Sequence, residues 1–210
     1  MAIAAIAADC GICQTIGAPA EIRYCDAHHR YFWGDQRLTS VSAVISACYP
    51  KKSWDGVDMA VIEHARERGI RVDRLLTEYV ATGNVVVPAG EWSEVIDRFE
   101  RAMSWWDRTV GYTLQGPIQT QKILYSQLDG VAGTADFVIG DTVIDLKNTA
   151  QLEKSYALQL GSYALYSGSR SCAVLHVTKD SCKLVSYDAA KCIEYWKSCV
   201  QWYRAMEELK

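Results

Sequence analysis

Hydrophobic residues recur at two spacings along the chain, and the change between them divides it into helical and strand segments. Helical spacing predicts helices within 40–80 and over 91–110, and Gly69 is expected to bend or divide the stretch that contains it. After Gly116-Pro117 the pattern changes to strands separated by short turns. The predicted strands are 118–128, 131–139, 142–147, 172–178 and 182–187, with helices over 152–166 and 189–209. This order predicts an α/β fold with a central mixed sheet flanked by helices.

The first 35 residues differ from the rest and are predicted to be a small appended module, with the main domain spanning 36–210. Cys10 and Cys13 form one short pair, and Cys25 with His28 forms a second, with His29 as the alternative fourth ligand. Two pairs of soft or borderline ligands separated by a loop are typical of structural Zn²⁺, and a closed set of four leaves no catalytic position. The alternative is an N-terminus in which the cysteines are incidental.

Composition adds limits rather than a function. The chain has 210 residues, half of them hydrophobic, and a net charge of −3. This charge does not indicate nucleic-acid binding, so any contact with DNA would need a local basic groove. Lys51-Lys52, Arg98, Arg101 and Arg108 could supply positive charge, but each fits a solvated surface residue better than a phosphate contact. The short apolar start lacks a positive leader, which favours a cytoplasmic protein without a membrane contact.

The chemistry is concentrated in two predicted strands. Asp136 and Asp145 are placed at the ends of adjacent strands joined by a tight turn, where their carboxylates can meet. Clustered carboxylates suit Mg²⁺ or Mn²⁺. Lys147 lies two residues beyond Asp145 and therefore leaves the strand on the same face, where an ammonium can orient a water and stabilise charge on a phosphate. Phosphodiester hydrolysis follows from this set.

The same segment resembles the PD-(D/E)XK nuclease superfamily, in particular its RecB-like, phage-type exonuclease branch, which includes the mitochondrial genome-maintenance exonuclease. The elements Gly133-Thr-Ala-Asp136, Asp145-Leu-Lys147 and Gln159 with Tyr163 follow one another in that branch's order and spacing. The resemblance implies a restriction-endonuclease-like core. It also implies that Gln159 and Tyr163 face the active centre, although a half-buried Tyr is also ordinary core filler.

The resemblance covers roughly residues 36–188 and has two departures. Asp73 stands where the family often has a metal-binding His, and an Asp is also a possible oxygen ligand. The family frequently carries a Glu on the strand before Gly-Thr-x-Asp, whereas this chain offers Gln121 or Gln127. Some relatives hold an iron–sulfur cluster, but Cys172, Cys182, Cys192 and Cys199 are too widely spaced for one and fit core positions.

The function implied is that of an intracellular Mg²⁺- or Mn²⁺-dependent DNA nuclease, an exonuclease of phage or bacterial recombination, repair or end processing. Its substrate would be single-stranded DNA or duplex ends, with a recombination or repair protein as a possible partner. The metal ligands implied are Asp136 and Asp145, with Asp73 and the Leu146 carbonyl as further ones. A nucleic-acid- or partner-binding protein on a weakened nuclease fold is the alternative, motivated by the missing Glu and by Asp73.

The zinc hypothesis gives the first prediction. Protein purified after expression in zinc-replete medium should contain about one zinc per chain, because four ligands of this kind bind structural zinc tightly. Elemental analysis measures the stoichiometry, and Cys13→Ser should lower it. Protein free of zinc would rule out the predicted module.

Overall fold

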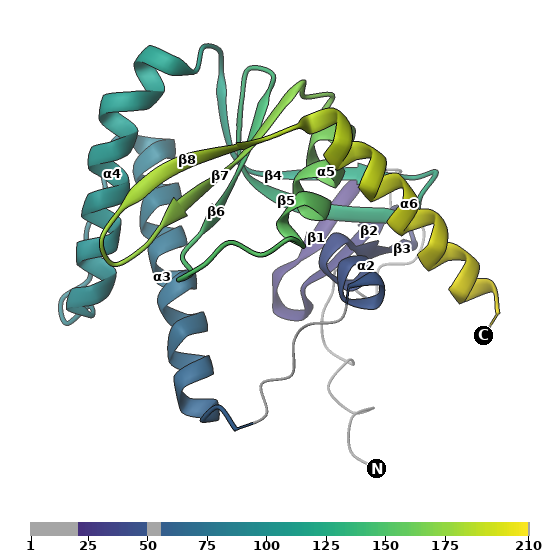
Figure 1. Ribbon diagram of the computed structural model, residues 1–210, viewed down its shortest axis with the longest axis horizontal. Helices are drawn as coiled ribbons and strands as arrows, with labels where there is room; N and C mark the ends of the chain where they lie inside the picture. The colour runs from purple at the N-terminus through teal and green to yellow at the C-terminus, as the bar shows by residue number, and fades with distance from the viewer. Residues whose placement is uncertain (1–20, 50–55, 210) are drawn as a thin grey trace.

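The computed structural model describes residues 21–49 and 56–209, without the side chains of 111–113, and shows a mixed sheet flanked by helices (Figure 1). The strands are β1 (Ile22–Cys25), β2 (Arg30–Trp33), β3 (Gln36–Ser40), β4 (Ile118–Ser126), β5 (Val131–Ile139), β6 (Thr142–Lys147), β7 (Ser171–Val177) and β8 (Cys182–Tyr187). The helices are the short 3-10 helix η1 (Asp26–His28) and α2 (Val41–Cys48), α3 (Met59–Thr82), α4 (Ser93–Thr113), α5 (Tyr156–Ser167) and α6 (Ala189–Glu208). The predicted α/β class with a central mixed sheet is confirmed.

Strand β5 is the branch point of the sheet. One edge of β5 pairs with β4 along nearly its whole length, from Val131 to Ile139. The other edge is shared, because β3 pairs parallel with Val131 and Ala132 whereas β6 pairs antiparallel with 137–139. The intervening residues, 133–136, form no ladder with either strand on that edge. The sheet then continues from β6 through β7 to β8.

Two helical layers cover the two faces of the sheet. On one face, α3 and α4 pack their apolar stripes on Phe137, Ile144 and Leu175. On the other face, α2, α5 and α6 bury Val138, Val143 and Val174. Because side chains alternate along a strand, Asp145 leaves β6 on the same side as Val143, which is the side that α5 covers. Figure 1 shows α3 and α4 together on one side of the sheet, with α6 opposite.

Gly69 was expected to bend or divide its helix, and the structure shows that it does not divide it. Helix α3 runs without interruption from Met59 to Thr82. Its first turn is capped by the Asp58 side chain, which accepts from the Ala60 N–H at 2.9 Å, and Gly83 ends it with a left-handed φ of 75°. A single internal Gly costs only about 1 kcal/mol, which good helix formers on both sides and two caps offset.

Two glycines set the position of α5. A Cβ on Gly161 would lie 2.0 Å from the Cys192 carbonyl oxygen, so only Gly lets α5 approach α6 this closely. A Cβ on Gly133 would lie 2.9 Å from both Tyr163 Cε1 and Val41 Cγ2. Gly133 therefore leaves room for the Tyr163 ring on β5. The Tyr163 face of α5 thus lies against residues 133–136 of β5, which pair with neither β3 nor β6, and we call this gap the opening in the sheet.

Residues 22–33, which show no sustained strand pattern in the sequence, form two short strands of the same sheet. Strand β2 pairs antiparallel with β3, so the proposed boundary after residue 35 falls within a β-hairpin. Cys25 Sγ lies 3.4 Å from His28 Nδ1, whereas His29 Nδ1 is hydrogen-bonded to the Tyr24 hydroxyl at 2.7 Å. Cys10 and Cys13 lie outside the described residues. The zinc site and the division into two domains therefore stay predictions.

The later cysteines have the core positions expected of them. Cys172, Cys192 and Cys199 are buried in the layer formed by α2, α5 and α6, and Cys182 packs against the opposite layer. Burial raises the pKa of the Cys172 and Cys182 thiols to about 12, which disfavours thiolate and metal ligation. No helix within residues 21–49 or 56–209 has the length and apolarity needed to cross a membrane.

Candidate active site

The candidate site lies where β5 and β6 separate. Their last ladder pair is Phe137 with Ile144, so the next residues along each strand, Asp136 and Asp145, face each other just beyond it. The Leu146 N–H, which is not used by β5, donates to Asp136 Oδ2 at 2.7 Å. Asp136 is thus in the middle of β5 rather than at its end as expected. The end of the ladder, not the end of the strand, brings the two carboxylates together.

Asp145 and Lys147 form an ion pair in this opening. Asp145 is 2% exposed, and Lys147 Nζ lies 2.5 Å from Asp145 Oδ2. The spacing of two residues places both side chains on one face of β6, as predicted. Lys147 Nζ also lies 5.1 Å from the centroid of the Tyr156 ring, which stabilises the charged ammonium by a cation–π contact.

Burial is the largest cause of the pKa shifts of the two strand-borne carboxylates in this site. Burial raises the pKa of Asp136 well above its ordinary value, and the charges of Asp145 and Asp73 raise it further. Burial also raises the pKa of Asp145, although Lys147 opposes this effect. Burial acts to lower the pKa of Lys147, but Asp145 and Asp136 together outweigh it and the net shift is upward. Lys147 is therefore a protonated group in this state, not a base.

Asp73 joins the cluster from helix α3. Burial raises the pKa of Asp73 to about 6, the charge of Asp145 adds to the increase, and Lys147 and the Thr77 side chain oppose it. Asp73 Oδ1 is buried and has no hydrogen-bond partner among the described residues. A buried carboxylate oxygen with no donor is costly, and a cation would satisfy it. The charge of Asp73 thus interacts with those of the two strand-borne aspartates.

Gln121, not Gln127, occupies the position beside Asp136. Thr120 pairs with Phe137 and Lys122 with Ala135, so Gln121 lies across the β4–β5 ladder from Asp136. Its backbone has a left-handed φ of 47°, which is unusual for Gln. Its Nε2 lies 3.5 Å from Asp136 Oδ1 and 3.3 Å from Thr77 Oγ1. The Gln127 carbonyl instead accepts from the Gly130 N–H in the β4–β5 turn.

Gln159 and Tyr163 lie one helical turn apart on α5 and face the carboxylates. Gln159 Nε2 donates to the Tyr163 hydroxyl at 3.2 Å, which leaves the phenol hydrogen able to donate elsewhere. Tyr163 is 4% exposed. Burial raises the pKa of Tyr163 well above its ordinary value, with Asp145 and Asp136 contributing. The phenol is consequently a neutral hydrogen-bond donor beside the acidic cluster.

Several contacts that support the site join residues far apart in the chain. The Tyr31 hydroxyl is hydrogen-bonded to Thr134 Oγ1 at 2.9 Å, which ties β2 to the Gly133-Thr-Ala-Asp136 element. In the loop after Lys147, Arg98 Nη1 donates to Asn148 Oδ1 at 2.9 Å, and His176 Nε2 is hydrogen-bonded to the Thr149 carbonyl at 2.8 Å. Sequence reasoning missed these partners because no local pattern marks them.

The side chains of the acidic cluster do not complete a metal site, so a bound ion would keep water in its shell. Within residues 21–49 and 56–209, no group of three or more His, Cys, Asp or Glu side chains could hold a metal by itself. Mg²⁺ ordinarily takes one or two carboxylates and keeps several waters. The facing Asp136 and Asp145, with the partnerless Asp73 Oδ1 beside them, suit such a partly hydrated ion.

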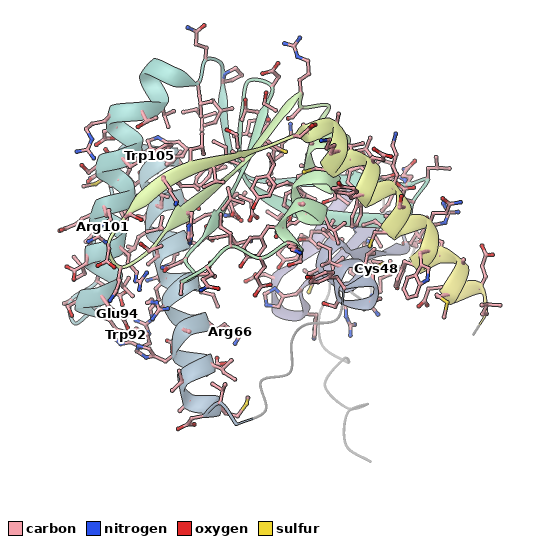
Figure 2. The ribbon with its side chains drawn as sticks, in the orientation of Figure 1. Cys48, Arg66, Trp92, Glu94, Arg101 and Trp105 are labelled. Carbon is pink, nitrogen blue, oxygen red and sulfur yellow. The ribbon has the colours of Figure 1, made fainter. Side chains whose placement is uncertain are left out.

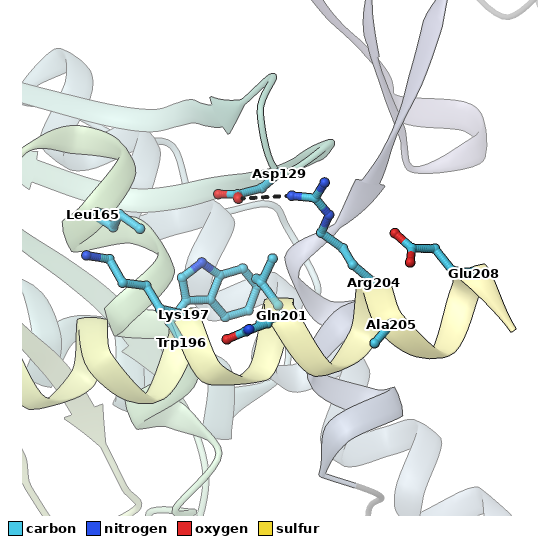
Figure 3. Close-up of a pocket in the computed structure, with 9 residues that line it drawn as sticks. Asp129, Leu165, Trp196, Lys197, Gln201, Arg204, Ala205 and Glu208 are labelled. Carbon is cyan, nitrogen blue, oxygen red and sulfur yellow. Dashed lines mark ion pairs between the residues drawn. The ribbon is translucent and has the colours of Figure 1, made fainter.

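Two other hollows lie away from these residues. One, of about 410 Å³, lies between α6 and the β4–β5 turn; it is lined in part by Trp196, Lys197 and Arg204, with Arg204 Nη1 4.0 Å from Asp129 Oδ1 (Figure 3). The other, of about 470 Å³, is lined in part by Tyr49, Tyr187 and Tyr195. None of the candidate catalytic aspartates lines either hollow.

Comparison with known proteins finds similar solved structures but no matching sequence. No protein-family model and no curated protein matches the chain. The alkaline exonuclease of Laribacter hongkongensis matches with a TM-score of 0.46 and 13% identity, over 82% of this chain and 88% of that one. The same enzyme in complex with dAMP gives 0.45 and 14% over the same shares. A putative exonuclease from Eubacterium rectale gives 0.45 and 14%, over 81% and 82%.

The raised pKa of Asp73 predicts a pH-dependent stability. Between its ordinary value of 3.8 and about 6, the native state binds more protons than the unfolded state, so the free energy of unfolding falls as pH rises through this window. In EDTA at pH 7.5, Asp73→Asn should therefore raise the free energy of unfolding by about 1–3 kcal/mol. At pH 4 the gain should largely vanish.

Urea unfolding from pH 4 to pH 8 measures this difference. Asp97→Asn, which alters an exposed carboxylate on α4, is the matched control and should leave the pH profile unchanged. An Asp73→Asn variant less stable than the native chain at pH 7.5 would mean that Asp73 is favourably paired in the native state.

Proposed function

We propose that the protein is a divalent-metal-dependent deoxyribonuclease, an exonuclease acting in phage or bacterial recombination, repair or end processing. The observation that carries this proposal is the pair of facing carboxylates, the partly buried Asp136 and the buried Asp145, beside a protonated Lys147. The ordered resemblance of the surrounding motifs to PD-(D/E)XK nucleases supports it. Single-stranded DNA or duplex ends are the proposed substrate, and the cytoplasm of a bacterial or phage-infected cell is the proposed location.

The charge balance is the reason for proposing a metal. Burial raises the pKa values of Asp73, Asp136 and Asp145, the charge of Asp145 raises those of Asp73 and Asp136 further, and Lys147 supplies a single opposing charge. Mg²⁺ or Mn²⁺ would relieve this repulsion, since hard divalent ions prefer carboxylate and carbonyl oxygens. Asp136 and Asp145 are the proposed principal ligands, with Asp73 and the Leu146 carbonyl as further ones.

Lys147 and Asp145 have proposed roles in catalysis besides that of the metal ion. A bound divalent ion would supply Lewis-acid polarisation of the phosphate and a lowered pKa for water. Lys147 would place a positive charge where negative charge develops on the phosphate and would orient the attacking water by donating to it. Because Asp145 holds Lys147 in one place before the substrate arrives, no reorganisation of the ammonium is needed during the reaction.

The α5 pair and Gln121 are proposed to position these groups. Tyr163 can donate its phenol hydrogen to a phosphate oxygen, since Gln159 already donates to the phenol oxygen. Gln121 holds Asp136 Oδ1 by a long hydrogen bond of 3.5 Å and adds no negative charge. The family's Glu would add one. We infer that the neutral side chain leaves Asp136 oriented while the site carries less charge for the metal.

A binding protein without catalysis is the second candidate, and Gln121 is the observation that favours it. A carboxylate missing beside Asp136 would weaken metal affinity and with it any cleavage. Such a protein would retain the fold and the contacts to DNA or to a partner. The intact ion pair of Asp145 with Lys147 favours the enzyme, because a purely structural role does not require a partly buried lysine beside the aspartates.

Cleavage should depend on the two members of that ion pair. Asp145→Asn and Lys147→Met should each lower the rate of Mn²⁺-dependent cleavage by about 100-fold or more, because one removes a metal ligand and the other removes charge stabilisation. Labelled single-stranded and duplex DNA, titrated with Mg²⁺ and Mn²⁺, provide the measurement. Lys183→Met, which alters an exposed lysine on β8, is the matched control.

Native rates in both variants would contradict the proposed mechanism. DNA binding by the unaltered protein without cleavage at any metal concentration would instead identify the binding protein.

A further inference from the structure

Arg98 contacts the loop that follows Lys147, and Arg68 and Arg101 lie close enough to Arg98 to affect its charge. Arg98 on α4 donates from Nη1 to Asn148 Oδ1 at 2.9 Å. Arg101, one turn further along α4, donates to the Thr178 carbonyl at 3.3 Å. The positive charge of Arg68 on α3 lowers the pKa of Arg98. We call Arg68, Arg98, Arg101 and Asn148 together the arginine pocket; the name stands for these four side chains and not for a cavity, since they line neither of the two hollows described above. Figure 2 labels Arg101 and Glu94 on α4, beside α3.

The arginine pocket departs from the sequence-based expectation for Arg98 and Arg101. Both were expected to be solvated surface residues, yet both are partly buried, whereas Arg108 is exposed as expected. Burial lowers the pKa of Arg98, and the neighbouring Arg68 and Arg101 lower it further. A guanidinium stays protonated despite such shifts. The protein therefore holds like-charged guanidinium groups close together in a partly desolvated environment. This arrangement is unfavourable in free energy unless an anion balances the charge.

The neighbouring acidic groups do not balance these charges. Glu94 Oε2 lies 3.2 Å from Arg68 Nη1, while its Oε1 is held by His64. Glu94 and the exposed Asp180 oppose the lowering of the Arg98 pKa, but the net shift is still downward. Among the described residues, the carboxylates that act on Arg98 are therefore Glu94, which is shared with Arg68 and His64, and the solvated Asp180. This local excess is the basic surface that a nucleic-acid-binding protein of net charge −3 would need.

Two hydrogen-bond donors in the pocket lack partners. Arg68 Nε and Asn148 Nδ2 are buried, and neither has a hydrogen-bond partner among the described residues. Both atoms can only donate, so an acceptor is required to satisfy them. Buried polar groups without partners are rare in native proteins and mark sites that a ligand or water completes. A ligand with several acceptor oxygens and a negative charge fits both the orphan donors and the excess charge.

We propose that the arginine pocket binds a backbone phosphate of the nucleic-acid strand, next to the phosphate that is cleaved. This inference rests on the proposed nuclease function and deepens it. Phosphate oxygens accept from guanidinium groups in the fork geometry that Arg provides and Lys does not. The position follows from the chain, because Asn148 directly succeeds Lys147. A strand held here would enter the site in a fixed register, since phosphate contacts position nucleic acid.

Salt-dependent binding tests the arginine pocket without any need for cleavage. The affinity of the full-length protein for fluorescein-labelled single-stranded and duplex oligonucleotides is measured by anisotropy in EDTA, over a range of NaCl concentrations. Arg98→Gln should weaken binding by about tenfold and reduce the magnitude of the salt slope by about 0.7–0.9, the loss of one phosphate contact. Arg98→Lys should keep the slope because it keeps the charge. Arg101→Gln provides a second, independent variant.

Arg66→Gln is the matched control, since Arg66 is an exposed residue of α3 paired with the exposed Glu63 at 2.8 Å. Its affinity and slope should equal those of the native chain. Inorganic phosphate should compete only at concentrations far above those of the oligonucleotide, whereas equal competition would assign the pocket to free phosphate and overturn the proposal. Circular dichroism establishes that each variant is folded.

The outcomes separate this inference from the nuclease proposal. Native slopes in both Arg98→Gln and Arg101→Gln, in a protein that binds and cleaves DNA, would overturn the arginine pocket and leave the nuclease intact. Arginine-dependent binding in a protein that cleaves nothing with any metal would retain the pocket and overturn the nuclease.

Discussion

The structure of the site depends on the repulsion between carboxylates held at the point where β5 and β6 separate. Asp136 and Asp145 face each other just past the last pair of the ladder, and burial raises the pKa values of both. Lys147 balances part of this charge. The Leu146 N–H, released from strand pairing, supplies a further donor to Asp136. A site of this kind stores an unfavourable interaction in the native protein, which a divalent cation would convert into binding energy.

The surrounding fold keeps this arrangement from relaxing. Strand β5 is fixed along one edge by β4, while β3 and β6 divide its other edge and leave the opening between them. Gly133 and Gly161 let α5 come close enough to place Tyr163 over the opening. The layer of α3 and α4 supplies Asp73 on one side and Arg98 on the other. Each helical layer therefore carries residues to the same gap in the sheet.

The sequence predicts those parts of the site whose geometry follows from residues close together in the chain. The two-residue spacing of Asp145 and Lys147 fixes their common face, and a tight turn between β5 and β6 fixes Asp136 opposite Asp145. Other parts depend on partners far apart in the chain. The choice of Gln121 over Gln127 follows from strand register, and the contact of Arg98 with Asn148 spans 50 residues. The two four-residue strands before residue 34 were too short to show an alternation of hydrophobic and polar residues. The helix around Gly69 continues through it because both helix ends are capped.

The most direct measurement is the thermal unfolding midpoint of the protein at pH 7.5 as a function of Mn²⁺ concentration. If the three aspartates repel one another and share a divalent cation, the midpoint of the native protein should rise with Mn²⁺, because a ligand that binds only the native state stabilises it. The rise should be lost in Asp136→Asn, and NaCl of equal ionic strength should not reproduce it. A midpoint that stays constant up to millimolar Mn²⁺ would contradict the metal site on which the proposed function rests.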